Sequence, residues 1–191
     1  AVRALDEYYP EDMEDILILD VCAAPGGKTT YAAEHFPAAR VISGDISAEK
    51  TALIEENAAR LRLDNIMTRV WDATVCDLEM EERAAMVIAD LPCSGLGTIG
   101  KKADIRLRVK PEDIDSLAVL QRTILGNVQA YVREGGILAY STCTITPQEN
   151  HENAEWFAEH FSFRLIRETQ LIPDDGSDGF YSAVFRKVIN K

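Results

Sequence analysis

Short apolar runs alternate along the chain with longer segments in which apolar residues recur at helical spacing. The short runs contain mainly Ile, Val, Leu and Ala and are followed by polar or Gly-containing turns, as buried strands are. The expected strands are residues 16–21, 40–46, 66–71, 85–89 and 136–141, with two more in 163–172 and 179–188.

Helices are expected between these strands, at residues 28–36, 48–63 and 117–132, and a long Gly-rich connection is expected at about 91–111. The sequence TPQE indicates one more helix start. Thr146 has the residue type of an N-cap, Pro147 suits the first turn, and Glu149 completes a capping box. This pattern predicts a helix soon after the fifth strand.

The alternation of strands and helices predicts an α/β protein with a Rossmann-like fold. We expect a mostly parallel, twisted sheet with helices on both faces and an antiparallel strand at the C-terminus. Ligands of such folds bind outside the carboxyl ends of the strands. No internal repeat or domain boundary is visible, so we interpret residues 1–191 as one domain, with residues 1–15 as the remainder of an upstream segment.

The 191 residues are 47% apolar and 27% charged, which suits one soluble domain with a substantial core. No apolar stretch approaches the roughly 20 residues that a membrane span needs. The N-terminus lacks a basic-then-apolar leader. The four cysteines form no C-x-x-C pair, which argues against zinc. We therefore expect a cytoplasmic, monomeric protein that has no metal site and does not bind membranes.

The net charge of −12 argues, taken alone, against a nucleic-acid partner, because binding to phosphate relies on basic surface. One segment departs from this average. Residues 101–110, KKADIRLRVK, hold five cations against the single acid Asp104: Lys101, Lys102, Arg106, Arg108 and Lys110. An isolated basic run is usually a solvated loop, so its meaning depends on where the fold places it.

The sequence DVCAAPGGKTT, residues 20–30, follows the first expected strand and allows two interpretations. As a phosphate loop, G-x-x-x-x-G-K-[ST], it lacks the first glycine, because Cys22 stands in that place. As the nucleoside loop of a Rossmann-like fold, it requires an acid about 20 residues later to bind the ribose hydroxyls. Asp45 meets that requirement, and a phosphate loop has no use for it. The nucleoside interpretation is favoured.

Acids also end the next two strands, where Asp72 and Asp90 stand. Aspartate often ends a strand simply because it favours turns. Here, however, four consecutive strands end in the glycine loop or in an acid at one edge of the sheet. We expect this edge to form the binding site.

Two cysteines follow neighbouring strands, Cys93 in DLPCSG and Cys143 in STCT. In a parallel sheet they would lie close together and face the same crevice. Cys22 and Cys76 are interpreted as unreactive structural residues. If the helix capped by Thr146 begins close to Cys143, its dipole would favour the thiolate.

The motifs CAAPGGK, DLPCSG, STCTITPQEN and DGFYSAVFRK resemble, in this order, those of the Sun (RsmB-like) family of RNA cytosine-5 methyltransferases. The chain is most similar to the bacterial branch that modifies 16S ribosomal RNA. The resemblance spans about residues 16–187 and implies a class I methyltransferase catalytic domain that uses S-adenosylmethionine. The N-terminal RNA-binding domain of relatives is not recognisable in the sequence.

The resemblance also assigns roles to residues. Cys143 would attack cytosine C6, Asp90 would hydrogen-bond the base, and Cys93 would assist release of the product. The S-adenosylmethionine site would consist of Cys22, Ala23, Ala24, Pro25, Gly26, Gly27, Lys28, Asp45, Asp72 and Asp90. The basic segment follows Cys93, so RNA phosphates are expected at Lys101, Lys102, Arg106 and Arg108. A P-loop NTPase and a catalytically inert RNA- or nucleoside-binding module are the alternatives.

Overall fold

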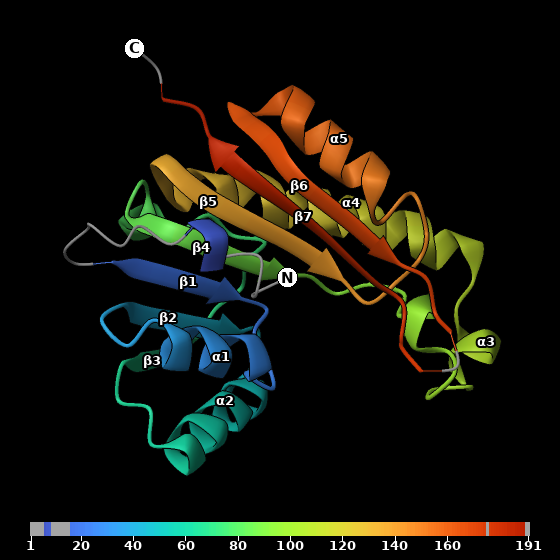
Figure 1. Cartoon of the computed structure of the whole chain (residues 1–191). Coiled ribbons are helices and arrows are strands. Elements are labelled where there is room, and N and C mark those ends of the chain that lie inside the picture. Colours follow the sequence, from blue (N-terminus) through green and yellow to red (C-terminus); the bar gives the residue numbers. More distant parts are fainter. Residues whose placement is uncertain (1–5, 9–15, 175, 190–191) are drawn as a thin grey trace.

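The computed structural model describes residues 6–8, 16–174 and 176–189. Most of the interpreted upstream segment 1–15 therefore lies outside the described residues. One seven-stranded sheet runs through the molecule in the order β3-β2-β1-β4-β5-β7-β6 (Figure 1). The strands are β1 Leu17–Val21, β2 Arg40–Asp45, β3 Ile66–Val70, β4 Ala84–Asp90, β5 Val132–Thr142, β6 Phe163–Leu171 and β7 Phe180–Lys187.

The strand pairing confirms the predicted fold class. Strands β1 to β5 pair in parallel, and β7 lies antiparallel between β5 and β6. The α-helices are α1 Gly27–His35, α2 Ala48–Leu61, α3 Ile105–Arg108, α4 Pro111–Val128 and α5 His151–His160. Short 3-10 turns lie at Asp6–Tyr8, Leu78–Met80, Leu96–Thr98 and Gln129–Tyr131.

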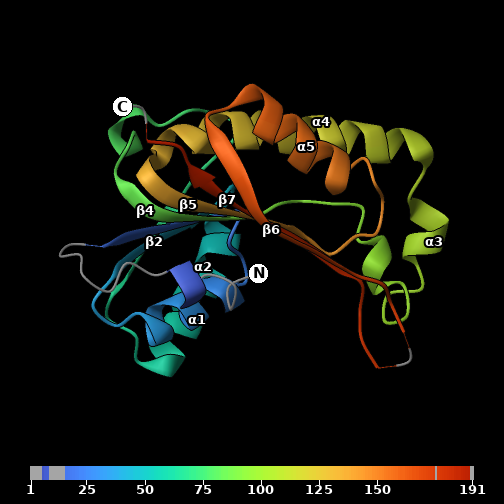
Figure 2. The same cartoon turned by 45° about the horizontal axis from the view of Figure 1, so that its top comes forward.

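Helices cover both faces of the sheet, with α4 and α5 on one side and α1 and α2 on the other (Figure 2). Each face has its own core. Ile124 and Leu125 of α4 and Phe157 of α5 pack on the first face, whereas Ala32 and Phe36 pack on the second. Because the central strands are covered on both sides, β1 is buried throughout and reads as a continuous apolar run interrupted only by an aspartate.

Two expected helices have boundaries that differ from the structure. Helix α4 begins at Pro111, where the Lys110 N–H donates to the Asp113 carboxylate at 2.9 Å, and Val132 already belongs to β5. Thr146 does not cap a helix: its hydroxyl donates to the Glu149 carboxylate within a turn, and α5 begins only at His151. The TPQE pattern correctly predicted a helix soon after the fifth strand, but the helix starts later than expected.

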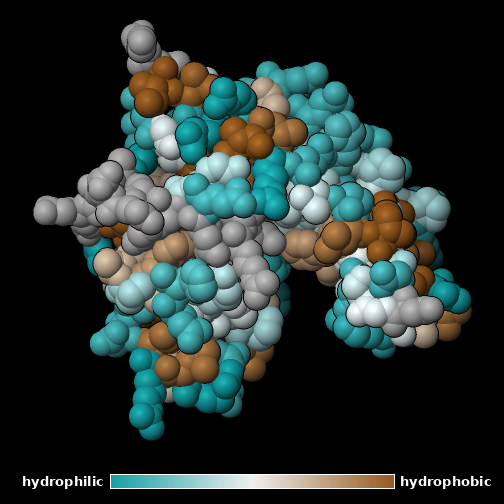
Figure 3. Space-filling view, in the orientation of Figure 1, coloured by the Kyte–Doolittle hydropathy of each residue, from teal (hydrophilic) through white to brown (hydrophobic). Residues whose placement is uncertain are grey.

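A lobe projects from the carboxyl end of the sheet, formed by residues 94–108 and by the described residues 172–174 and 176–179 between β6 and β7 (Figure 1). Figure 3 shows a deep notch between this lobe and the part of the molecule built on α1 and α2. The carboxyl ends of the parallel strands point toward the notch (Figure 1). Within the described part of the chain, no helix is long and apolar enough to cross a membrane.

Candidate active site

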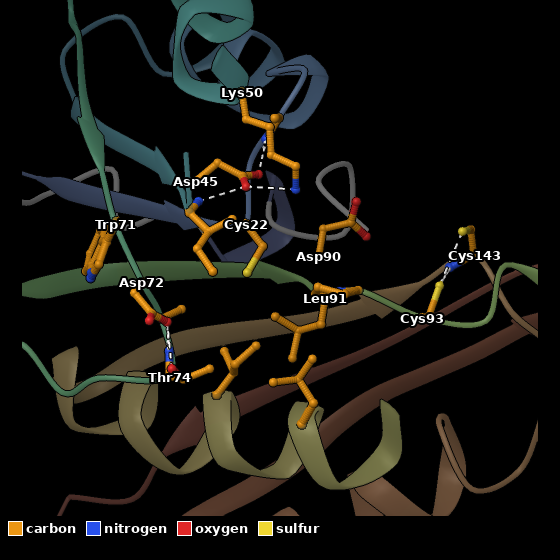
Figure 4. A pocket seen from close by; sticks show the side chains of 16 residues that line it. Cys22, Asp45, Lys50, Trp71, Asp72, Thr74, Asp90, Leu91, Cys93 and Cys143 are labelled. Atoms are coloured by element: carbon orange, nitrogen blue, oxygen red, sulfur yellow. Dashed lines mark hydrogen bonds and ion pairs between the residues drawn. The ribbon is translucent and has the colours of Figure 1, made fainter. Parts of the chain in front are cut away.

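The residues that end strands β1 to β5 meet at one cavity of about 300 Å³ (Figure 4). Cys22 follows β1, Asp45 ends β2, Asp72 follows β3, Asp90 ends β4 and Cys143 follows β5. All five line the cavity, and Cys93 lies beside Cys143 at its far end. The structure thus brings together at one edge the side chains that the strand order predicts there.

The glycine loop turns the chain from β1 into α1. Gly26 has φ 98°, a left-handed conformation that favours glycine. A Cβ atom on Gly26 would also lie 3.1 Å from the Ile54 side chain of α2. Cys22 and Ala24 of this loop line the cavity. The loop residues Ala23, Pro25, Gly26, Gly27 and Lys28 are not among its lining residues.

The hydroxyl of Thr29 contradicts the P-loop interpretation. A phosphate loop uses this hydroxyl on the metal ion of a bound nucleotide. Here Thr29 is fully buried, donates to Asp20 at 2.6 Å, and lies 2.8 Å from the Ser43 hydroxyl. Asp20 is itself buried, and burial raises its pKa to about 7. The Thr29 side chain therefore contributes to the core beneath the loop.

Asp45 is buried and organises one end of the cavity. Its carboxylate accepts the N–H groups of Ala24 at 3.0 Å and Ile46 at 2.8 Å, and it pairs with Lys50 at 3.0 Å. Sequence reasoning missed Lys50, although its place in the first turn of the helix after Asp45 was a usable signal. A carboxylate has about four lone-pair sites, so Asp45 retains capacity for a ligand hydroxyl.

A flat apolar slot lies next to Asp72. Its walls come from different elements: Trp71, Ala73, Leu91, Leu120 and Ile124. Thr74 donates both its hydroxyl, at 2.6 Å, and its backbone N–H, at 2.9 Å, to one oxygen of Asp72. These bonds hold the pKa of the Asp72 carboxyl below its usual range. The sequence analysis did not single out Leu120 and Ile124 of α4, because their apolar spacing resembles that of any core helix.

Asp90 lies between Cys22 and the two other cysteines of the cavity (Figure 4). One carboxylate oxygen accepts the Ser141 hydroxyl at 2.6 Å, and the other forms an ion pair with Lys28. Lys28 also lies over the Phe180 ring, 5.6 Å from its centroid. Asp90 thus joins Lys28 at the end of the glycine loop to strand β5, which leads into Cys143.

The sulfur atoms of Cys93 and Cys143 are 3.3 Å apart. The Cys143 N–H also donates to the Cys93 sulfur at 3.3 Å. Hydrogen bonding from the Cys93 thiol lowers the pKa of Cys143 to about 7, and the same contact raises the pKa of Cys93. Burial raises the pKa of Cys22 to about 12, which makes its thiolate inaccessible at neutral pH. Cys143 is therefore the thiol best suited to act as a nucleophile.

The cause of this activation differs from the expected one. A helix dipole acts within the first turn, and α5 begins only at His151. The donor is Cys93, which reaches Cys143 from the neighbouring loop. Only the tertiary structure brings this partner into contact.

The basic residues lie on the lobe beside the cysteines. Lys101 pairs with Asp178 at 2.7 Å and Arg108 with Asp104 at 3.1 Å, whereas Lys102 and Arg106 have no acidic partner among the described residues. All four are exposed. A search of the described residues for three or more His, Cys, Asp or Glu side chains that could hold a metal ion finds none.

A family model described as 16S rRNA methyltransferase RsmB/F matches residues 8–186. The chain belongs to the RsmB/F family. Ribosomal RNA small subunit methyltransferase B of Erwinia tasmaniensis is 36% identical over 183 residues, which are 91% of this chain and 42% of that relative. The same-named protein of Yersinia pseudotuberculosis is 34% identical over 98% of this chain and 46% of that relative. The chain thus spans less than half the length of these RsmB/F relatives.

Solved structures agree with the RsmB/F assignment. NSun6 from Pyrococcus horikoshii, solved with SFG, has a TM-score of 0.77 at 27% identity and covers 99% of this chain and 51% of that one. A methyltransferase homolog protein from Pyrococcus horikoshii has a TM-score of 0.78 at 26% identity, over 92% of this chain and 62% of that one. The fold is that of these methyltransferase structures.

Proposed function

We propose that this RsmB/F chain is the catalytic domain of an S-adenosylmethionine-dependent RNA cytosine-5 methyltransferase that acts on 16S rRNA. The observation that carries the proposal is the pair of thiols 3.3 Å apart at the end of an acid-lined cavity. A single activated cysteine would suit many reactions. A second thiol in contact with it suits a reaction in which a covalent adduct must form and then be released.

The cavity fits S-adenosylmethionine by its donor set. The apolar slot beside Asp72 suits adenine, with the second Asp72 oxygen as acceptor for the amino group. Buried Asp45 suits the ribose hydroxyls. When bound, S-adenosylmethionine supplies a methyl group on a sulfonium sulfur. Cys22 and Ala24 of the glycine loop line this site, and the remaining loop residues as far as Lys28 lie around it.

Cytosine C5 is a weak nucleophile, and the thiolate of Cys143 overcomes this. Its sulfur forms a bond to C6, and the C5–C6 π electrons shift toward C4 and N3. C5 thereby becomes an enamine carbon. The Asp90 carboxylate, fixed by Ser141 and Lys28, accepts a hydrogen bond from the N4 amino group and orients the base for attack at C6. The base must be unpaired or flipped to reach these groups.

Release reverses the first step after the methyl group has been added. The C5 proton passes to solvent water, its electron pair restores the C5–C6 double bond, and the Cys143 sulfur departs as a thiolate. Cys93 is in contact with that sulfur, so its thiol is in place to assist the departure. The inert-module alternative offers no reason for such a pair, and the buried Thr29 disfavours the NTPase.

The test is to trap the adduct. We expect Cys93→Ala, incubated with S-adenosylmethionine and a 16S rRNA transcript, to accumulate a covalent protein–RNA complex that migrates slowly on a denaturing gel. The reaction is run above pH 8, because this variant also loses the donor that lowers the Cys143 pKa. Radiolabelled methyl groups in the slow band would show that transfer preceded the arrest.

The matched control is the double variant Cys93→Ala/Cys143→Ser, which should give no slow band while binding S-adenosylmethionine as the single variant does. Persistence of the band in the double variant would assign the nucleophile to another residue. Cys76→Ser, which alters an exposed cysteine outside the cavity, should behave as the wild type.

A further inference from the structure

Buried Glu149 lies at the junction of the two cysteine loops. Its side chain is fully buried, and its two oxygens accept four hydrogen bonds. The Ser94 N–H donates at 2.8 Å and the Ser94 hydroxyl at 2.6 Å. The Thr146 hydroxyl donates at 2.7 Å and the Gln121 side-chain amide at 3.2 Å. Every one of these donors is buried.

These bonds connect both sides of the thiol pair. Ser94 is the residue after Cys93, and its hydroxyl lies 2.7 Å from that of Thr144, the residue after Cys143. The same Gln121 amide holds the Pro92 carbonyl at 2.8 Å, on the other side of Cys93. The backbone flanking Cys93 is therefore held before and after the cysteine, and the loop carrying Cys143 is tied to it.

We propose that Glu149 is a positioning residue that holds Cys93 against Cys143, so that the Cys93 thiol hydrogen-bonds the nucleophile. This inference rests on the proposed role of Cys143. Glu149 touches neither sulfur. It acts by satisfying the buried donors of Ser94, Thr146 and Gln121, which would otherwise have to move to find acceptors. Any movement of the Ser94 backbone shifts its neighbour Cys93.

Two substitutions separate geometry from charge. Glu149→Ala removes all four acceptor contacts. Glu149→Gln preserves them: its amide oxygen accepts from the Ser94 N–H and from Gln121, and its amide nitrogen donates to the Ser94 and Thr146 hydroxyls, which can accept. Thr51→Ala is the matched control, since it also removes a buried hydroxyl but lies at the start of α2, away from the cysteines.

The readout is the rate of Cys143 alkylation by iodoacetamide between pH 6 and 10, followed by peptide mass spectrometry. Only the thiolate reacts, so the rate rises as pH passes the pKa of Cys143, about 7 in the wild type. In Glu149→Ala we expect this midpoint to move up to the ordinary thiol range, with alkylation at pH 7 roughly tenfold to fiftyfold slower. Glu149→Gln and Thr51→Ala should keep the wild-type profile.

An unchanged midpoint in folded Glu149→Ala would overturn the proposal. A midpoint shift in Glu149→Gln as large as in Glu149→Ala would also overturn it, because the charge of Glu149 rather than its hydrogen-bond contacts would then set the pKa of Cys143. If Glu149→Ala does not fold, the variants Ser94→Ala and Thr146→Ala are measured instead. Each should raise the midpoint of the alkylation profile by part of the shift expected for Glu149→Ala. If neither variant shifts the midpoint, Glu149 does not position Cys93. RNA does not enter this assay, so its result is independent of the adduct trap.

Discussion

At the scale of single residues, the reactivity of Cys143 depends on a neighbour from another loop. The Cys93 thiol supplies a hydrogen bond to the thiolate, while the nearby carboxylate of Asp90 opposes the charge and Lys102 favours it. Because the largest contribution is a contact between two side chains, a single substitution at Cys93 should change the chemistry of Cys143 without altering the fold.

We therefore predict that Cys93→Ala raises the pKa of Cys143. The thiolate is the form present above the pKa, so its fraction at pH 7 should fall, and alkylation at that pH should slow by about tenfold to fiftyfold. Cys93→Ser keeps a hydroxyl donor and should lie between the wild type and the alanine variant. Equal profiles for all three proteins would mean that the two sulfurs do not interact.

At the scale of elements, Gly97 attaches the lobe to the loop that carries Cys143 and also joins the two segments of the lobe. The Gly97 N–H donates to the Cys143 carbonyl at 3.0 Å, and the Gly97 carbonyl accepts the Gly179 N–H at 2.7 Å. A Cβ atom on Gly97 would collide with the Gly179 oxygen and would lie 2.7 Å from the Cys143 oxygen. The backbone segments can approach this closely only because neither glycine has a side chain.

Gly97→Ala should consequently destabilise the protein by about 1–3 kcal/mol, the usual cost of forcing extra volume into a packed site. The matched control is Gly100→Ala on the same lobe, where a Cβ atom meets nothing within 4 Å. Urea unfolding measures both variants. If the two changes cost the same, the close contact of Gly97 is not what holds the lobe.

At the scale of the whole molecule, a net charge of −12 must be reconciled with RNA as the proposed partner. The cations that face outward on the lobe offer local basic surface beside the notch. Two of them already have acidic partners, which reduces the charge that they present to phosphate. The pair formed by Lys102 and Arg106 should therefore dominate contact with the RNA backbone.

This difference predicts an unequal salt dependence of RNA binding. For single-stranded RNA, removing one cation that binds a phosphate should reduce the slope of log K against log salt by about 0.7. Lys102→Ala/Arg106→Ala should lower the slope by roughly 1.4, and Lys101→Ala/Arg108→Ala by clearly less. Fluorescence anisotropy titrations at several salt concentrations provide the comparison. A larger effect from the second pair would show that the ion pairs open on binding.

The sequence alone determined the class of fold and most of its elements. The apolar runs that become β1, β2 and β4 are buried on both faces, so burial itself imposes the pattern from which they were predicted. The helix expected to start at Thr146 starts instead at His151, and Glu149, the residue that suggested a capping box, accepts hydrogen bonds from Ser94 and Gln121. Local spacing carries no information about these distant donors.

The residues of the site also fall into a group that the sequence predicted and a group that only the structure shows. Cys22, Asp45, Asp72, Asp90 and Cys143 could be predicted together, because parallel strands deliver their carboxyl ends to one edge. The sequence did not predict four other features: Lys50, the α4 wall of the apolar slot, the contact between Gly97 and Gly179, and the role of Glu149. Each of these depends on atoms from distant segments that come within a few ångströms only after the sheet and its loops have packed. Sequence determined which groups reach the site, and tertiary packing decided their mutual contacts and therefore their chemistry.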